Sequence, residues 1–372
     1  MKIIFVSNNW ADAHQQVRLQ ALLALCPSLV CLTFTRTYYP ATSSIEPLWT
    51  GRMEHASYLK RWNIYIQFFR QLYKTVKNGD IVYTYGFDLA AITLLFRTLT
   101  RRSVYLVHEV PDIREMFFRK GKAGWLLRRI ERWVIPRIDL LVVTSPEYVT
   151  EYYQKLRGLP VRKYLVIENK IHTRPHHLPN TPERPASQNR IRIGYFGLLR
   201  CKASLDCLML LACTNRFDII LRGIFMPDTR HYESLVKETP NMQYLGPYDA
   251  PKELKTLYGS VDIVWAAYPY SPRSITGNHL WARTNRFYES LYFRRPIVVQ
   301  KGTSDADRAR TLGNIAIEVD LEDTRQAAQY LEEQLTPDYL QDMEKALTAI
   351  PEHEYLIKDE YKTLVRCLQL RK

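Results

Sequence analysis

The stretch that decides the fold is VDIVWAAY at 261–268, followed by TNRFYES at 284–290 and PIVVQ at 296–300. The first and last of these runs are apolar, which predicts two buried strands, and the middle run predicts a helix that begins after a long polar loop. A strand, a helix and a second strand in this order are typical of a parallel sheet with helices on its faces. We therefore expect an α/β fold in which the loop from 268 to 283 lies at the carboxyl ends of the strands.

The beginning of the predicted helix has the character of an anion site. The main-chain N–H groups of Thr284, Asn285 and Arg286 have no partner within the helix, and this end of a helix favours anionic oxygens such as those of phosphate. Glu289 follows at about 7 Å along the helix axis. This is roughly the step from a diphosphate to the ribose hydroxyls, from which a carboxylate accepts hydrogen bonds. A capping or surface role for Glu289 is the alternative interpretation.

Strands and helices alternate along the whole chain, on both sides of a proline-rich segment. Strands are expected at 2–7, 30–35, 80–84, 103–108, 140–144 and 164–168 and, in the second half, at 190–197, 217–223, 242–245, 261–267, 296–300 and 316–319. Between the early strands, helical patterns cover 12–25, 58–76, 89–98 and 124–137. This alternation predicts parallel, doubly wound sheets.

The proline-rich segment predicts two domains. Four prolines fall between 175 and 185, so we interpret 172–190 as a linker. The expected architecture is two tandem Rossmann-like domains, 1–171 and 191–354, with a ligand cleft between them. A last helix within 355–372 is expected to return to the first domain.

The net charge of +14 is carried by one half of the chain. Residues 1–185 contain 27 Lys and Arg against 14 Asp and Glu, whereas the remaining residues contain 25 against 24. Such an asymmetry is typical of proteins that bind either nucleic acid or an anionic membrane surface. No nucleic-acid-binding module is recognisable in the sequence, and the cations stand among large aromatic residues, so we do not expect a nucleic-acid partner.

Two basic, aromatic segments point instead to a membrane surface. Both have Lys and Arg mixed with large rings at helical spacing, a composition that suits a helix lying in the membrane interface. An ordinary surface helix with one buried face is the alternative. The residues assigned to this side are Lys60, Arg61, Trp62, Arg119, Lys120, Lys122, Trp125, Arg128 and Arg129.

The sequence shows neither a membrane span nor a metal motif. No run reaches about 18 apolar residues, and the apolar run of residues 3–6 is too short for a signal peptide, so we expect a cytoplasmic protein. The six cysteines form no C-x-x-C pair and favour reduced structural thiols. The histidines at 172, 176 and 177 stand among prolines without acidic or Cys partners, so no metal or other cofactor is expected.

A second group of charged residues follows the strand that ends near Gly197. Arg200 and Lys202 come within five residues of this glycine, on a loop expected at the carboxyl end of the sheet, where two cations can hold a diphosphate. Solvated surface residues are the alternative. The sequence has no G-x-G-x-x-G and no Walker A motif, which argues against dehydrogenases and P-loop enzymes.

In the first half, the run YLVHEVPD at 105–112 predicts a strand that leads directly into a loop with His108, Glu109 and Asp112. Ligands of open α/β sheets lie at the carboxyl ends of strands. We therefore predict that these three residues belong to the reacting centre, the alternative being a buried histidine bonded to main chain.

With these motifs assembled, the second half resembles the donor domain of GT-B glycosyltransferases, close to the family-4 group that builds bacterial surface polysaccharides. The likeness rests on IGYFGLLRCK at 193–202, NMQYLGPYDAPKELKTLYGSVDIVWAAY at 241–268 and NRFYESLYFRRPIVVQKGT at 285–303. The first half is similar through VSNNWADAHQQVR at 6–18, LVHEVPDI at 106–113 and IDLLVVTSPEYV at 138–149.

The resemblance implies a nucleotide-sugar donor on the second domain, an acceptor on the first, and transfer without a metal. Carried over by position, Glu289 would hold the ribose, Arg200 and Lys202 the pyrophosphate, and the main chain of Thr284, Asn285 and Arg286 the phosphates. His108 would lie beside the transferred sugar. The basic first half suggests a lipid-linked saccharide acceptor at the inner face of the cell membrane.

One position departs from the family pattern. The residue eight places before the ribose carboxylate is usually a Glu that contacts the sugar, and here it is Trp281. Retention of anomeric configuration is slightly favoured, because inversion would need a general base such as Glu109 or Asp112. Two alternatives stay open: a catalytically silent GT-B scaffold of a polysaccharide assembly complex, and a nucleotide-sugar epimerase or phosphorylase on the same fold.

Overall fold

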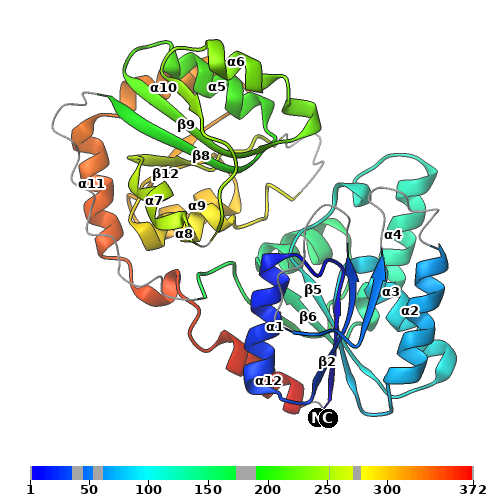
Figure 1. Ribbon diagram of the computed structural model, residues 1–372. Coiled ribbons are helices and arrows are strands. Elements are labelled where there is room, and N and C mark those ends of the chain that lie inside the picture. Colours follow the sequence, from blue (N-terminus) through cyan, green and yellow to red (C-terminus); the bar gives the residue numbers. More distant parts are fainter. Residues whose placement is uncertain are drawn as a thin grey trace. The chain divides into compact units, whose positions relative to one another are not determined.

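The computed structural model describes residues 2–35, 45–52, 62–172, 190–250, 252–270 and 278–370. The chain forms two units: unit 1 comprises Met1–Glu168 and Lys358–Lys372, and unit 2 comprises Asn169–Ile357. Each unit contains a parallel sheet with helices on both faces (Figure 1). The predicted α/β class with two Rossmann-like domains is confirmed, and the C-terminal helix belongs to unit 1. Most of the predicted linker, 173–189, lies outside the described residues.

In its described residues, unit 1 has a seven-stranded parallel sheet of order β3-β2-β1-β4-β5-β6-β7. Its strands are β1 Ile3–Ser7, β2 Leu29–Thr35, β3 Trp49–Arg52, β4 Ile81–Tyr85, β5 Tyr105–Val110, β6 Leu140–Val143 and β7 Tyr164–Val166. The order reverses at β1 and β4, which are neighbours in the sheet although β2 and β3 lie between them in sequence. Ligand sites of open sheets lie at such a reversal, at the carboxyl ends of the strands.

The helices of unit 1 cover both faces of its sheet. In Figure 1, α1 and the C-terminal α12 lie together on one face, and α2, α3 and α4 lie on the other. The bounds of these helices are α1 Ala13–Leu25, α2 Trp62–Thr75, α3 Phe87–Thr100, α4 Lys122–Val134 and α12 Glu360–Gln369. Two 3₁₀ turns, Glu115–Phe117 and Ile135–Arg137, flank α4, and a π-helix, Tyr148–Leu156, connects β6 to β7.

Unit 2 repeats this plan with six strands among its described residues, in the order β10-β9-β8-β11-β12-β13. The strands are β8 Ile191–Leu199, β9 Phe217–Phe225, β10 Met242–Tyr244, β11 Ile263–Trp265, β12 Ile297–Gln300 and β13 Ala316–Val319. Helices α5, α6 and α10 lie on one face and α7, α8 and α9 on the other (Figure 1). The helices of unit 2 are α5 Lys202–Ala212, α6 Tyr232–Glu238, α7 Leu254–Gly259, α8 Asn285–Phe293, α9 Ser304–Leu312, α10 Thr324–Gln334 and α11 Pro337–Thr348, with 3₁₀ turns at Pro227–Thr229 and Glu352–Glu354.

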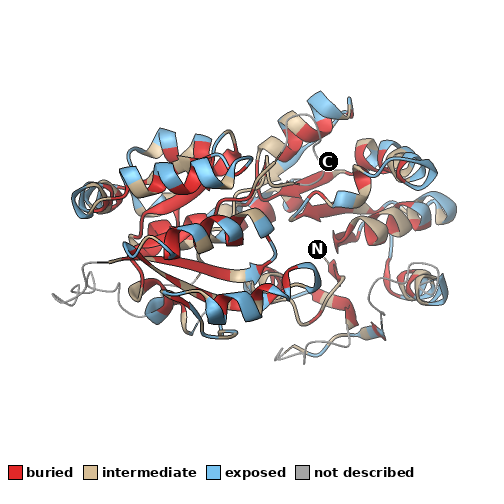
Figure 2. Cartoon of the chain, turned by 90° about the horizontal axis from the view of Figure 1, so that it is seen from above, coloured by how far each residue is buried: buried red, intermediate tan, exposed pale blue. Residues whose placement is uncertain are grey.

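Burial follows the sequence pattern in both units. Every residue of β1, β4, β6 and β12 is buried, as expected of parallel strands covered on both faces. Helices bury only one face; α11, for example, buries Leu340, Met343 and Leu347 at spacings of three and four. Figure 2 shows this contrast as red strands and helices that are red on one side and pale blue on the other.

Four features differ from the sequence-based prediction. The short strand β3 and the π-helix were not predicted. Strand β5 runs two residues further than expected, because Glu109 pairs with Tyr85 of β4 and Val142 of β6. His108 and Glu109 therefore lie inside the strand, and of the three predicted residues Asp112 alone lies in the loop. The last helix begins at Glu360 because Leu356 instead forms a parallel bridge with Ile171.

Candidate functional site

In unit 2, Arg286 and two tyrosine rings form the centre of the predicted donor site. Arg286 is the second residue of α8, and its guanidinium carbon lies 5.1 Å from the ring centroid of Tyr195 and 5.2 Å from that of Tyr268. Such a stack attracts the cation to the ring faces without neutralising its charge. Among the described residues, no carboxylate forms an ion pair with Arg286, so its charge is available to a ligand.

Arg200 approaches the same ring of Tyr268. Its guanidinium carbon lies 5.7 Å from the ring centroid, its side chain is exposed, and the described part of the chain gives it no ion pair either. His279 stacks on Tyr268 with ring centroids 4.8 Å apart. Burial and then the two arginines lower the pKa of His279 to about 4, so this histidine is neutral at pH 7. Lys202, the first residue of α5, is exposed two positions beyond Arg200.

Gly197 fits closely beside Arg286. Its φ of +96° is strained for other residues, and a Cβ here would lie 3.4 Å from Nη2 of Arg286. The neighbouring strand is equally close, because a Cβ on Gly223 would meet the Gly197 carbonyl oxygen at 1.8 Å. The main chain of Gly197 therefore borders the Arg286 guanidinium, and the Tyr248 hydroxyl lies near the same position.

Glu289 follows Arg286 by three residues on α8. Its Oε2 accepts a hydrogen bond of 2.6 Å from the Tyr258 hydroxyl, and the residue is half-buried. Burial raises the pKa of Glu289, while Tyr258 and Arg286 act in the opposite direction. Burial and then the charge of Glu289 raise the pKa of Tyr248 to about 12. Glu289 thus lies near Tyr258, Tyr248 and the Arg286 cation.

The beginning of α8 differs from the prediction in one respect. Thr284 caps the helix, and both its N–H and its hydroxyl donate to Asp305, at 3.1 Å to Oδ1 and 2.8 Å to Oδ2. Its N–H is therefore not available to phosphate as predicted, because a buried carboxylate already occupies it. The N–H groups of Asn285 and Arg286 have no hydrogen-bond partner among the described residues. Burial raises the pKa of Asp305 to about 7.

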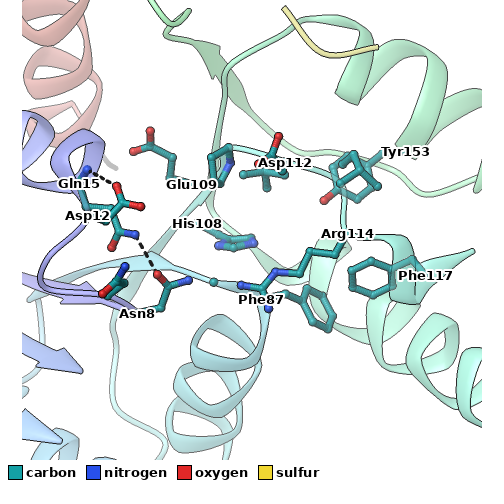
Figure 3. Close-up of a pocket in the computed structure, with 15 residues that line it drawn as sticks. Asn8, Asp12, Gln15, Phe87, His108, Glu109, Asp112, Arg114, Phe117 and Tyr153 are labelled. Atoms are coloured by element: carbon teal, nitrogen blue, oxygen red, sulfur yellow. Dashed lines mark hydrogen bonds between the residues drawn. The ribbon is translucent and has the colours of Figure 1, made fainter. Parts of the chain in front are cut away.

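In unit 1, the predicted reacting centre borders a pocket with a cavity volume of about 280 Å³ (Figure 3). The pocket lies at the carboxyl ends of β1, β4 and β5, at the sheet reversal. Its lining residues come from the end of β5, from the segments that follow β1, β4 and β5, and from the π-helix: Asn8, Asn9, Asp12, Gln15, Gly86, Phe87, His108, Glu109, Val110, Pro111, Asp112, Ile113, Arg114, Phe117 and Tyr153.

The loop between β1 and α1 is held in place by its own side chains. Asp12 caps α1 by accepting from the Gln15 N–H at 3.0 Å. The Gln15 side chain then donates to Asn8 and accepts from Ser7, both at 2.8 Å. These bonds fix amide and carboxylate groups along one side of the pocket before any ligand binds.

His108 lies at the centre of the pocket in Figure 3 and is 2% exposed. Its Nδ1 is 3.3 Å from the Thr84 carbonyl oxygen, which can only accept, so Nδ1 carries the proton. Burial lowers the pKa of His108 to about 4; the Thr84 bond acts against this, and the Arg114 charge adds to it. The ring is therefore neutral, and its Nε2 has a free lone pair, since no described residue bonds to it.

Glu109 has the surroundings of a structural ion pair. Its carboxylate receives Nη2 of Arg18 at 2.7 Å and Nε at 3.0 Å, and both side chains are at most 1% exposed. The Tyr83 hydroxyl also donates to it. The Arg18 guanidinium in turn lies 4.9 Å from the ring centroid of Tyr361 on α12. Among the predicted carboxylates, Asp112 is exposed at the pocket and Glu109 is engaged beneath it.

The predicted membrane side is exposed where the structure describes it; Lys60 and Arg61 lie outside the described residues. Trp62 is 70% exposed on α2, and Trp125 and Leu126 are 55% and 53% exposed on α4. Arg129 lies over the Trp125 ring. Exposed cations of the same segment are Arg119, Lys120 and Lys122, whereas Arg128 donates to the carbonyl oxygens of Phe117 and Arg119. No described helix is long and apolar enough to cross a membrane.

Several site residues were not found from the sequence. In unit 2 these are Tyr195, Tyr268 and His279, which present no motif and reveal their role only by stacking against the arginines. In unit 1 they are Arg114 and Tyr153. Arg114 follows the run 105–112 by two positions and could have been included on that ground. Trp281 is buried, at 5% exposed.

Comparisons with known proteins give one relative in sequence and several solved structures with the same fold. Residues of this chain match the succinoglycan biosynthesis protein ExoL of Rhizobium meliloti (strain 1021) with 25% identity over 336 residues, 87% of this chain and 82% of that protein. No family model matches the chain. Among solved structures, HepE of Anabaena in complex with UDP and glucose has a TM-score of 0.71, and sucrose-phosphate synthase of Thermosynechococcus elongatus has 0.70. Each has 13% identity and covers 99% of this chain, and this chain covers 99% and 98% of them.

The chain therefore has the GT-B fold of these structures, as the resemblance in sequence predicted. In sequence, the chain is similar to a protein of succinoglycan biosynthesis.

Proposed function

We propose that the chain transfers a sugar from a nucleotide-sugar donor to a lipid-linked saccharide acceptor in surface-polysaccharide biosynthesis. The observation that carries this proposal is the pair of unneutralised arginines, Arg200 and Arg286, stacked on Tyr268 beside the free N–H groups of α8. Cations without carboxylate partners, next to a helix N-terminus, suit a diphosphate. HepE, which shares the fold, was solved with UDP-glucose.

The donor would be held entirely by unit 2. Arg200, Arg286 and exposed Lys202 would receive the diphosphate, and Glu289 would accept hydrogen bonds from the ribose hydroxyls. The negative charge that develops on the departing diphosphate would be stabilised by these cations and by the α8 dipole. These groups fill the role that a metal ion has in other transferases, so we propose a reaction without a metal or other cofactor.

The acceptor and the transferred sugar would meet at His108. The neutral imidazole would accept a hydrogen bond from a sugar hydroxyl on Nε2, oriented by the Nδ1 bond to Thr84. During transfer, the bond from the anomeric carbon to the diphosphate breaks and a bond to the acceptor oxygen forms. For retention, the acceptor proton passes to the departing phosphate oxygen. We favour this course because Glu109 is engaged by Arg18; inversion would place the base role on Asp112.

The acceptor's lipid would bring the protein to the inner face of the cell membrane from the cytoplasm. The observation that supports this is the exposure of Trp62, Trp125 and Leu126 next to exposed cations of the same helices. Tryptophan rings at headgroup level and cations facing anionic lipid are the two contacts expected of a peripheral protein.

A catalytically silent scaffold is the second candidate. The observation that favours it is Trp281, a buried aromatic residue at the position from which the family's first Glu would contact the sugar. A scaffold, however, has no need for two unneutralised arginines in one site.

A thermal-shift titration with UDP, GDP, ADP and CDP, each with and without EDTA, tests the proposal. Because a ligand of the native state raises the melting temperature by mass action, we expect one nucleotide to raise Tm by several degrees and the shift to survive EDTA. The matched control is Arg325→Met, which removes an exposed cation of α10. No shift with any nucleotide would favour the scaffold.

A further inference from the structure

Arg114 is an unsatisfied cation in the wall of the unit 1 pocket. It is half-buried, yet its guanidinium makes no hydrogen bond or ion pair with any residue that the structure describes. Arginines nearby have such partners: Glu109 for Arg18, two carbonyl oxygens for Arg128 and Glu131 for Arg157, although Nη1 of Arg18 is left unpaired. A guanidinium has five donors in a planar fork, and the described residues leave those of Arg114 open to the pocket. Arg114 therefore has the state expected of a ligand-binding cation.

The surroundings of Arg114 are aromatic. Figure 3 shows Arg114 extending towards His108, with Phe87 and Phe117 beside it. The two phenylalanine rings are 5.0 Å apart, edge to face, and both line the pocket. Apolar walls exclude water and so strengthen the attraction between a cation and an anion that replaces the water.

Tyr153 adds a second unsatisfied group. It lines the pocket and is 3% exposed, and no described residue bonds to its hydroxyl. Tyr152 and Tyr153 are adjacent in the π-helix. The Tyr152 hydroxyl donates to Glu131 at 2.7 Å, whereas Tyr153 lines the pocket. π-helical turns are frequent at functional sites. A tyrosine that is buried, lines a pocket and has no described protein partner for its hydroxyl can donate that hydrogen bond to a ligand.

Acidic groups are also present, and Figure 3 places two of the three away from this region. Asp12 and Glu109 lie on the side of Asn8 and Gln15, while Arg114, Phe117 and Tyr153 lie on the opposite side of His108. Asp112 lies next to Tyr153 in this view. Asp12 already caps α1, and Glu109 is paired with Arg18. One side of the pocket thus suits neutral hydroxyls, and the other suits an anion.

We propose that Arg114 and Tyr153 form an oxyanion subsite, and that the acceptor carries a carboxylate or a phosphate that this subsite recognises. The inference rests on the proposed function, in which this pocket receives the acceptor. The Arg114 fork would take two oxygens, and the Tyr153 hydroxyl would donate to a third or share one. The oxyanion has two possible sources: the carboxylate of an acidic sugar, or the phosphate through which a saccharide is linked to lipid.

Ring ¹⁵N chemical shifts of histidine-labelled protein would test the subsite at pH 7, with the His108 signal assigned by its loss in His108→Gln. The probes are glucuronate, methyl phosphate and glucose. We expect saturable shifts of the His108 signal with at least one anion, and at least about tenfold weaker binding of glucose. Stronger binding of glucuronate assigns the anion to a sugar, and stronger binding of methyl phosphate assigns it to the lipid linkage.

Variants separate this role from a structural one. Arg114→Gln should weaken anion binding at least about tenfold, Arg114→Lys should retain part of it, and Tyr153→Phe should weaken it less. Arg325→Gln, the matched loss of a cation, should leave it unchanged. Equal binding of glucose and the anions, or unchanged anion binding in Arg114→Gln, would overturn the proposal.

The same variants distinguish a failure here from a failure of the proposed function. Nucleotide binding by unit 2 should be equal in wild type and Arg114→Gln. If the wild type binds no nucleotide, the proposed transfer is overturned, whatever the histidine signals show.

Discussion

The floor of the unit 1 pocket and the arginine cluster of unit 2 use the same residue type in opposite ways. Arg18 is buried against Glu109, and its charge is neutralised within the protein. Arg286 and Arg200 instead lie on the faces of tyrosine rings, which hold a cation without neutralising it. Burial with a carboxylate makes an arginine part of the fold, whereas stacking on an aromatic ring leaves it ready for an anionic ligand.

The largest effect is expected when the buried pair is broken. Arg18→Met should reduce the free energy of unfolding of unit 1 by about 3–5 kcal/mol, because it leaves Glu109 charged and unpaired in the interior. Urea unfolding followed by hydrogen exchange, resolved by unit, measures this. Arg18→Met/Glu109→Gln should recover part of the loss; a double variant that is less stable than the single one would show that the pair is not the cause.

Loss of an arginine of the unit 2 cluster should affect ligand binding more than stability. Arg286→Met should weaken nucleotide diphosphate binding about 100-fold, or ~2.7 kcal/mol, because the fork that receives the diphosphate is lost. The free energy of unfolding should change by less than about 1 kcal/mol. Isothermal titration calorimetry and urea unfolding give the two values. An Arg286→Met variant that is strongly destabilised but binds the nucleotide with unchanged affinity would remove the distinction between the two arginines.

Glu289 sharpens the assignment within unit 2. Glu289→Ala should weaken binding of a nucleoside diphosphate about tenfold to thirtyfold, because the ribose loses its acceptor. Binding of inorganic pyrophosphate, which has no ribose, should be unchanged, whereas Arg286→Met should weaken both. Calorimetry with the two ligands separates these outcomes. Equal loss of both ligands in Glu289→Ala would mean that Glu289 acts only by positioning Arg286.

A further expected effect is on the pH dependence of stability, and it has opposite signs in the two units. Burial lowers the pKa of His108 from 6.5 to about 4, so the unfolded chain binds more protons between these values and unit 1 loses stability as pH falls through this range. Burial raises the pKa of Asp305 from 3.8 to about 7, so the folded unit 2 binds more protons and loses stability as pH rises. His279 acts like His108 and partly offsets Asp305.

Unfolding free energies at pH 5, 6 and 7, resolved by unit, measure this contrast. His108→Gln should make unit 1 less sensitive to acid, and Asp305→Asn should remove the loss of unit 2 stability towards pH 7. A pH dependence of unit 2 that is the same in Asp305→Asn as in wild type would show that another group is responsible.

Much of the fold follows from local sequence patterns. The central parallel strands are continuous apolar runs, so their positions were predictable, and β13 begins and ends where expected. The strand β3 has only four residues, including Gly51, and lies at the edge of the sheet. Such a short segment has no recognisable alternation of apolar and polar residues, so it could not be predicted. The π-helix escaped notice because the residues 148–156 have an ordinary helical composition.

The candidate site was predictable to the extent that main-chain geometry decides it. The position of Arg286 follows from the helix beginning at Asn285. Partners that come from distant segments could not be found in this way: Arg18 with Glu109, or Asp305 with Thr284, are pairs that only tertiary packing brings together. The predicted role of Glu109 therefore rested on its neighbour His108, because the sequence did not show that Arg18 neutralises Glu109.

The division of unit 1 into two chain segments has a consequence for synthesis. Unit 2 is continuous from Asn169 to Ile357, whereas unit 1 includes Tyr361, which covers the buried Arg18. On a ribosome the first domain of a chain commonly folds first. Here the whole of unit 2 must be translated before Tyr361 exists, so the Arg18–Glu109 pair is without this cover while unit 2 folds, and the unit that is begun first is completed last.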